Sequence, residues 1–96
     1  MPLELSPDKP AVVLFKSPSC GNCEKLLPLF REAIAPYQAN IKTEIVDIRE
    51  DIQSAVDYGV LSVPIIIFFK NGKEVNRLVG LASKEKIIKS LQAIMP

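Results

Sequence analysis

Residues 17–30 read SPSCGNCEKLLPLF and contain both cysteines of this 96-residue chain, Cys20 and Cys23, three positions apart. The stretch directly follows a strongly apolar run at residues 11–16. A cysteine pair in this place can be a structural disulfide, half of a metal site or a redox couple. The choice among these three decides how the whole chain is interpreted.

The totals describe an ordinary small globular protein. A chain of 96 residues with 48% apolar and 24% charged residues is sufficient for one compact core. We therefore expect residues 1–96 to form a single domain. The formal net charge of +1 leaves no excess charge for binding nucleic acid or an anionic membrane. We expect a monomer that binds neither.

The amino terminus, MPLELSPDKP, has neither the basic region nor the long apolar stretch of a signal peptide. We expect residues 1–10 to form a short lead-in segment, in which Leu3 to Leu5 make at most a brief strand. The longest apolar run elsewhere, residues 63–69, is far shorter than a membrane-spanning helix. These features predict a cytoplasmic protein, and in a reducing compartment a close cysteine pair is more often catalytic or metal-binding than structural.

Hydrophobic patterning predicts the order β-α-β-α-β-β-α. The continuous apolar run at 11–16 is typical of a strand buried on both faces, which implies a parallel sheet. A helical stripe of apolar residues begins near Cys20, contains Pro28, where we expect a kink, and ends near Ala35. The other predicted elements are strands at 41–48, 65–70 and 74–79 and helices at 51–58 and after Ser83.

Local signals mark the ends of these elements. Asn71-Gly72 accepts the positive φ angles of a type I′ hairpin turn, and Gly59 is expected to end the helix at 51–58. Ser83 can cap the last helix. The expected apolar faces are Ile52, Ala55 and Val56 on the short helix and Ile87, Ile88, Leu91, Ile94 and Met95 on the last one. The result is a mixed four-stranded sheet covered by helices, with Cys20 at the carboxyl edge of the first strand.

Two interpretations of the cysteine pair have little support. As a structural disulfide, a loop of four residues contributes about 1.9 kcal/mol, against roughly 3 kcal/mol for a loop of fifteen. A tetrahedral zinc site needs four ligands, and the chain has two cysteines and no histidine. Carboxylates or a second copy would have to complete such a site. We expect no metal and no cofactor other than a redox-active Cys20–Cys23 disulfide.

The redox interpretation accounts for the position of the pair. A cysteine in the first turn of a helix faces unpaired backbone N–H groups and the positive end of the helix dipole, which favour the thiolate. Cys23 lies one turn later on the same face and is more covered by the helix. The sequence therefore predicts that Cys20 is the nucleophile and that Cys23 attacks the mixed disulfide formed at Cys20.

Several further features follow one known pattern: the CGNC motif at 20–23, Pro28, Tyr58-Gly59, Ser62-Val63-Pro64, the turn Phe69-Lys70-Asn71-Gly72, and Gly80. On these residues the chain resembles the thioredoxin family over about residues 11–96. The resemblance implies a thioredoxin-like α/β fold and a protein disulfide oxidoreductase that acts mainly as a reductant. It also implies protein substrates with disulfides, and regeneration by a thioredoxin-reductase-like flavoenzyme or by glutathione.

The resemblance further implies a cis peptide bond before Pro64, in a loop that faces the cysteines. In the family this loop offers backbone groups to an extended substrate segment, a form of strand addition. Val63, Pro64, Gly80 and Leu81 would border the substrate groove by their family position.

The chain departs from the family pattern around the cysteines. Gly21-Asn22 stands where Gly-Pro is usual, and that dipeptide tunes the redox potential. Ser19 replaces a tryptophan and Lys16 replaces an aromatic residue, so the contact surface is more basic. We expect partner choice to differ accordingly.

Leu14 and Ile45 occupy the positions of the family's buried aspartate and its neighbouring lysine. Losing one member alone would leave an unpaired buried charge that costs about 3 to 5 kcal/mol, whereas an apolar pair packs without that penalty. The usual proton acceptor for Cys23 is then missing. Water or Glu24 can take its place with Lys16 assisting, or both side chains are solvated surface charges.

The missing aspartate and tryptophan keep a second function open. In it the chain is a non-catalytic redox sensor or a docking module for one dedicated partner. A metal cluster or zinc site shared across a dimer is a third alternative.

Overall fold

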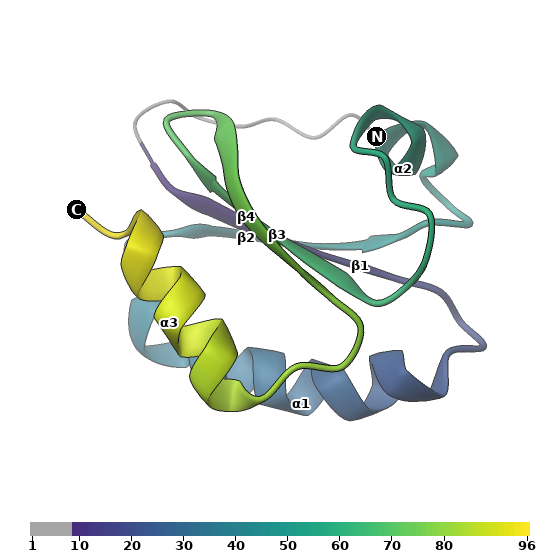
Figure 1. Cartoon of the computed structure of the whole chain (residues 1–96), viewed down its shortest axis with the longest axis horizontal. Helices are drawn as coiled ribbons and strands as arrows, with labels where there is room; N and C mark the ends of the chain where they lie inside the picture. The colour runs from purple at the N-terminus through teal and green to yellow at the C-terminus, as the bar shows by residue number, and fades with distance from the viewer. Residues whose placement is uncertain (1–8) are drawn as a thin grey trace.

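The computed structural model describes residues 9–96 of the chain (Figure 1). Most of the predicted lead-in segment at 1–10, with the brief strand considered at Leu3 to Leu5, lies outside the described residues. The predicted order of elements is confirmed. The elements are β1 (Ala11–Lys16), α1 (Gly21–Ile34), a 3₁₀ turn (Ala35–Tyr37), β2 (Lys42–Asp47), α2 (Ile52–Asp57), β3 (Ile65–Lys70), β4 (Lys73–Val79) and α3 (Lys84–Ile94).

The four strands form one mixed sheet in the order β2-β1-β3-β4. β1 and β2 are parallel and are connected through α1, while β3 runs antiparallel to both β1 and β4. In Figure 1, α1 and α3 lie on one face of the sheet and α2 lies on the other. This is the predicted mixed four-stranded sheet flanked by helices.

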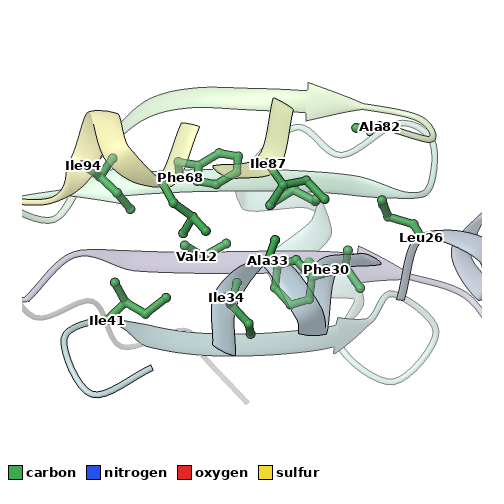
Figure 2. Packing of buried hydrophobic residues seen from close by; sticks show 13 residues of the cluster. Val12, Leu26, Phe30, Ala33, Ile34, Ile41, Phe68, Ala82, Ile87 and Ile94 are labelled. Atoms are coloured by element: carbon green, nitrogen blue, oxygen red, sulfur yellow. The ribbon is translucent and has the colours of Figure 1, made fainter. Parts of the chain in front are cut away.

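The central strands β1 and β3 are buried on both faces, as the continuous apolar runs predict. Residues 11–15 and 65–69 are each at most 4% exposed. Because successive side chains in a strand point to opposite faces, these runs feed two separate hydrophobic clusters. The larger cluster lies between the sheet and α1 and α3 (Figure 2). The second, on the face of α2, comprises Ala11, Val13, Phe15, Val46, Ile65, Ile67 and Phe69.

The predicted ends of the elements are confirmed by local geometry. Asn71 and Gly72 have φ angles of 56° and 77°, and Gly59, with φ of 64°, follows the end of α2. Ser83 Oγ accepts a hydrogen bond from the Lys86 N–H at 3.2 Å and so caps α3. α1 ends at Ile34, with Ala35 as its C-cap, and contains Pro28 inside a continuous helix.

The predicted apolar face of α2 is confirmed at Ala55 and wrong at Ile52 and Val56. The helix buries Ser54 and Ala55, whereas Ile52 and Val56 are 66% and 67% exposed. Ser54 can occupy the buried face because Asp51 accepts hydrogen bonds from its N–H at 3.1 Å and its hydroxyl at 2.7 Å. Residues two positions away lie about 200° around a helix, so Ile52 and Val56 then point to solvent.

We predict that Gly72→Ala lowers the free energy of unfolding by about 1–2 kcal/mol, because a residue with a Cβ is strained in the left-handed region. A Cβ at Gly72 meets nothing within 4 Å, so urea denaturation of this variant measures the backbone strain alone. Gly21→Ala is the matched control, since Gly21 also has open space around it but begins a helix, where alanine is favoured. Equal losses in the two variants would contradict the turn.

Candidate redox site

The two cysteines lie where β1 gives way to α1. Cys20 is the N-cap of α1, with extended backbone angles of φ −123° and ψ 105°. Cys20 is half-buried, while Cys23, one turn along the helix, is only 3% exposed. The structure joins them in a disulfide with a Cα–Cα separation of 5.2 Å. A partly exposed cysteine is thus paired with a buried one.

The first turn of α1 directs a hydrogen-bond donor at the sulfur of Cys20. The Cys23 N–H donates to Cys20 Sγ at 3.1 Å, and the Glu24 N–H donates to the Cys20 carbonyl at 3.2 Å. When the disulfide is open, the same N–H group and the helix dipole stabilise negative charge on Cys20 Sγ. Such stabilisation is what lowers the pKa of reactive cysteines at helix N-termini.

Strand register brings the Val63–Pro64 segment to the same edge of the sheet. Phe15, next to last in β1, pairs with Ile65, and Ile65 pairs with Val79. Pro64 therefore lies opposite the end of β1. That strand ends at Lys16, four residues before Cys20. The Gly80 N–H donates to the Pro64 carbonyl at 2.8 Å, and the Val63–Pro64 peptide bond is cis.

The predicted substrate residues differ in their exposure. Pro64 is buried, Val63 and Gly80 are half-buried, and Leu81 is 47% exposed. Gly21 and Asn22, between the cysteines, are both exposed. Sequence analysis did not single out Leu61, which lies in the loop before Pro64 and is 96% exposed. The sequence did carry a signal for this exposed side chain, since Leu61 belongs to no periodic apolar pattern and lies three residues before Pro64.

A small pocket lies beside the covered sulfur. Its lining residues are Lys16, Ser17, Pro18, Cys23, Glu24 and Leu27. Lys16 and Glu24, two of the four residues predicted to modulate the thiols, therefore border the same space as Cys23. Sequence analysis missed Asp47, whose carboxylate lies 3.9 Å from Lys16 Nζ. The two side chains meet because Lys16 and Asp47 are register partners at the ends of parallel strands.

The positions proposed to replace a buried ion pair are directly adjacent. Leu14 and Ile45 are register partners on β1 and β2, and Leu14 is fully buried in the cluster that Ile45 contacts. Within residues 9–96 the buried polar side chains are Ser54 and Ser90, so no carboxylate is buried beside Cys23 in this part of the chain. At these two positions the core between α1 and the sheet is therefore apolar.

In the described part of the chain, no three His, Cys, Asp or Glu side chains gather in a way that would hold a metal ion. None of the helices found there is both long and apolar enough to cross a membrane.

We predict that Leu14→Asp lowers the free energy of unfolding by about 3–5 kcal/mol at neutral pH, because it buries an unpaired charge. Adding Ile45→Lys should restore part of this loss, since the register places the two side chains next to each other. Urea denaturation of the parent, both single variants and the double variant gives the coupling free energy. Strictly additive losses would show that residues 14 and 45 do not interact.

Comparison with known proteins gives consistent matches over most of the chain. The family model described as thioredoxin matches residues 3–93. The chain is 34% identical over 88 residues to thioredoxin 1 of Nostoc sp., a match that covers 92% of this chain and 82% of that protein. It is 33% identical over 84 residues to thioredoxin of Rickettsia typhi, covering 88% and 80% of the two chains.

Solved structures agree with the sequence matches. The backbone is similar to a crystal structure of a thioredoxin from Nicotiana alata, with a TM-score of 0.82 and 30% identity over 93% of this chain and 76% of that one. It is also similar to the X-ray structure of Fasciola hepatica thioredoxin, with a TM-score of 0.80 and 29% identity over 91% and 82% of the chains.

Proposed function

Because the chain belongs to the thioredoxin family and is a thiol–disulfide oxidoreductase, we propose that it reduces disulfides of partner proteins through Cys20 and Cys23. The observation that carries this proposal is the hydrogen bond from the Cys23 N–H to Cys20 Sγ at the start of α1. It supports Cys20 as the nucleophile, because the same donor stabilises the thiolate that begins the reaction.

The exchange takes place in two steps. The Cys20 thiolate attacks one sulfur of the partner's disulfide, so that a Cys20–partner disulfide forms and the partner's second sulfur leaves as a thiolate. Cys23 then loses its proton and attacks Cys20 Sγ. The Cys20–Cys23 disulfide forms, the first partner sulfur leaves as a thiolate, and the partner has gained two electrons from the pair.

The substrate groove is proposed along Val63, Pro64, Gly80 and Leu81. The shared sheet edge supports this assignment, because it brings the Val63–Pro64 segment opposite the end of β1. An extended substrate segment would pair with the backbone of Val63, as in other cases of strand addition. Exposed Leu61 and Leu81 would contact apolar side chains that flank the substrate cysteine.

A reductant must itself be reduced after each cycle. We propose that a thioredoxin-reductase-like flavoenzyme or glutathione returns the couple to the dithiol. The cytoplasm suits this role, since it keeps thiols reduced. In this proposal the chain works there as a single-domain monomer, with no metal and no cofactor beyond its own disulfide.

A second candidate function is a redox sensor or docking module that is oxidised once by a dedicated partner. The observation that favours it is the apolar core at Leu14 and Ile45, which leaves no carboxylate buried beside Cys23 among the described residues. Reduction of insulin disulfides driven by dithiothreitol separates the two candidates. Many turnovers per protein molecule support the enzyme, and oxidation of one pair without turnover supports the sensor.

We predict that Cys23→Ser accumulates a mixed disulfide between Cys20 and a disulfide-containing peptide, because the second step needs the Cys23 thiolate. Mass spectrometry under non-reducing conditions should show one added peptide half at residue 20. Cys20→Ser is the matched control and should give far less adduct, since Cys23 is buried. Equal adducts at the two positions would overturn the assignment of roles.

We also predict that Glu24→Gln slows the second step by about tenfold. Removing a well-positioned general base slows a reaction by ~10² or more, and we expect a smaller effect because Glu24 is exposed. In this proposal Glu24 accepts the Cys23 proton through water in the pocket, and Lys16, beside Asp47, favours the thiolate. The measurement is the pH dependence of release of the second thiol.

Glu32→Gln is the control for this experiment, since Glu32 lies further along the same helix and its carboxylate forms an exposed pair with Lys84. It should leave the pH profile unchanged. A Glu24→Gln profile identical to that of the parent would show that solvent alone accepts the proton.

A further inference from the structure

The loop from Tyr58 to Pro64 connects α2 to β3 and ends at the proposed substrate-binding residues. Each end of this loop accepts a hydrogen bond. One donor is Arg77 in β4, and the other is Gly80, the residue directly after β4. At the end of the loop, the Gly80 N–H donates to the Pro64 carbonyl at 2.8 Å. At its beginning, Arg77 Nη2 donates to the Tyr58 carbonyl at 2.8 Å. Hydrogen bonds from the second half of β4 and from the residue after it therefore anchor the loop at both ends.

The guanidinium of Arg77 is itself held in a fixed orientation. Glu74 accepts hydrogen bonds from Arg77 Nε at 2.6 Å and from Arg77 Nη2 at 2.7 Å. A two-bonded arginine–carboxylate pair fixes the plane of the guanidinium, which is not possible with a single bond. Glu74 therefore directs Nη2 toward the Tyr58 carbonyl.

A β-bulge places Glu74 and Arg77 on the same face of the sheet. Residues three apart in a regular strand point to opposite faces. In β4, however, Glu74 pairs with Phe69 while Asn76 pairs with Phe68, so one extra residue is inserted between them. Arg77, the partner of Ile67, thus lies on the same face as Glu74, which is the face that carries Tyr58.

Tyr58 is fixed by its ring as well as by its carbonyl. The ring lies 5.4 Å from that of Phe69 in an edge-to-face contact and 6.4 Å from that of Phe15, measured between centroids. Because Tyr58 also closes α2, the positive charge of Arg77 stands at the end of the helix where carbonyl groups are exposed. The first residue of the loop is thus tied to both the sheet and the helix.

The ion pair persists at neutral pH. Hydrogen bonds from Arg77 lower the pKa of Glu74, and the Glu74 carboxylate raises the pKa of Arg77. A carboxyl with a lowered pKa in the folded state stabilises the fold above its unfolded pKa and loses that contribution as the pH falls through the folded value. The pair is therefore intact in the pH range where thiolates react.

We propose that Arg77 is a positioning residue for exchange with peptide and protein disulfides. With Glu74 it holds the Tyr58 carbonyl and so fixes the loop that presents Val63 to an extended substrate segment. The inference rests on the proposed function, because it assumes that substrates pair with Val63. A small disulfide has no chain to pair with this loop, so its reduction does not depend on Arg77.

The test compares Arg77→Met with the parent on two substrates, a disulfide-linked peptide and hydroxyethyl disulfide. For the peptide we expect KM to rise about tenfold, with kcat little changed. A tenfold change corresponds to the loss of one hydrogen bond from a charged group. The rate with hydroxyethyl disulfide should not change. Arg31→Met, which removes an exposed arginine from α1, is the matched control and should change neither rate.

Two more variants keep the test independent of folding. Arg77→Lys retains the charge but cannot form the two-bonded pair, and Glu74→Gln removes the carboxylate that orients Arg77. Both should raise KM for the peptide by less than Arg77→Met does, with unchanged reduction of hydroxyethyl disulfide. Thermal unfolding of each variant establishes that the compared proteins are folded.

Two results would overturn the inference. Equal losses on both substrates would mean that Arg77 supports the fold and not the loop, and an unchanged KM for the peptide in all variants would mean that the loop does not need it. Failure of the proposed function looks different, since the parent protein itself would then reduce hydroxyethyl disulfide but not the peptide. That result would remove the inference together with the function.

Discussion

The chemistry of this protein depends on one contact, the backbone N–H of Cys23 directed at the sulfur of Cys20. The contact exists because β1 ends at Lys16 and α1 begins at Gly21, which makes Cys20 the N-cap. A helix that began one turn later would leave the sulfur without this donor. The buried strand before the motif and the helix after it are therefore as necessary to the site as the two thiols.

Much of the fold follows from the sequence because its signals are local. Single short segments predict most of the elements. These signals are the apolar runs of β1 and β3, the Asn71-Gly72 turn and the Ser83 cap. The buried face of α2 was not fully predictable, because Ser54 is satisfied by the N-cap residue Asp51. Apolar spacing at Ile52 and Val56 gives no information about such a hydrogen bond.

The site was predictable to the extent that it lies in one segment. Cys20 and Cys23 are encoded within a single turn of helix, whereas the partners Lys16 and Asp47 meet only through strand register. Arg77 reaches Tyr58, nineteen positions away, because a bulge in β4 changes which face its side chain occupies. Sequence periodicity does not reveal a single inserted residue of this kind, so the contact between Arg77 and Tyr58 could not be predicted from the sequence.

The central claim is that the helix start stabilises the Cys20 thiolate although no carboxylate is buried beside Cys23 among residues 9–96. The most direct test is a thiolate titration of the reduced protein by ultraviolet absorbance, with Cys23→Ser used to assign the signal to Cys20. The account predicts a Cys20 pKa clearly below the value of about 8.5 for a free cysteine. A pKa at or above that value would contradict it.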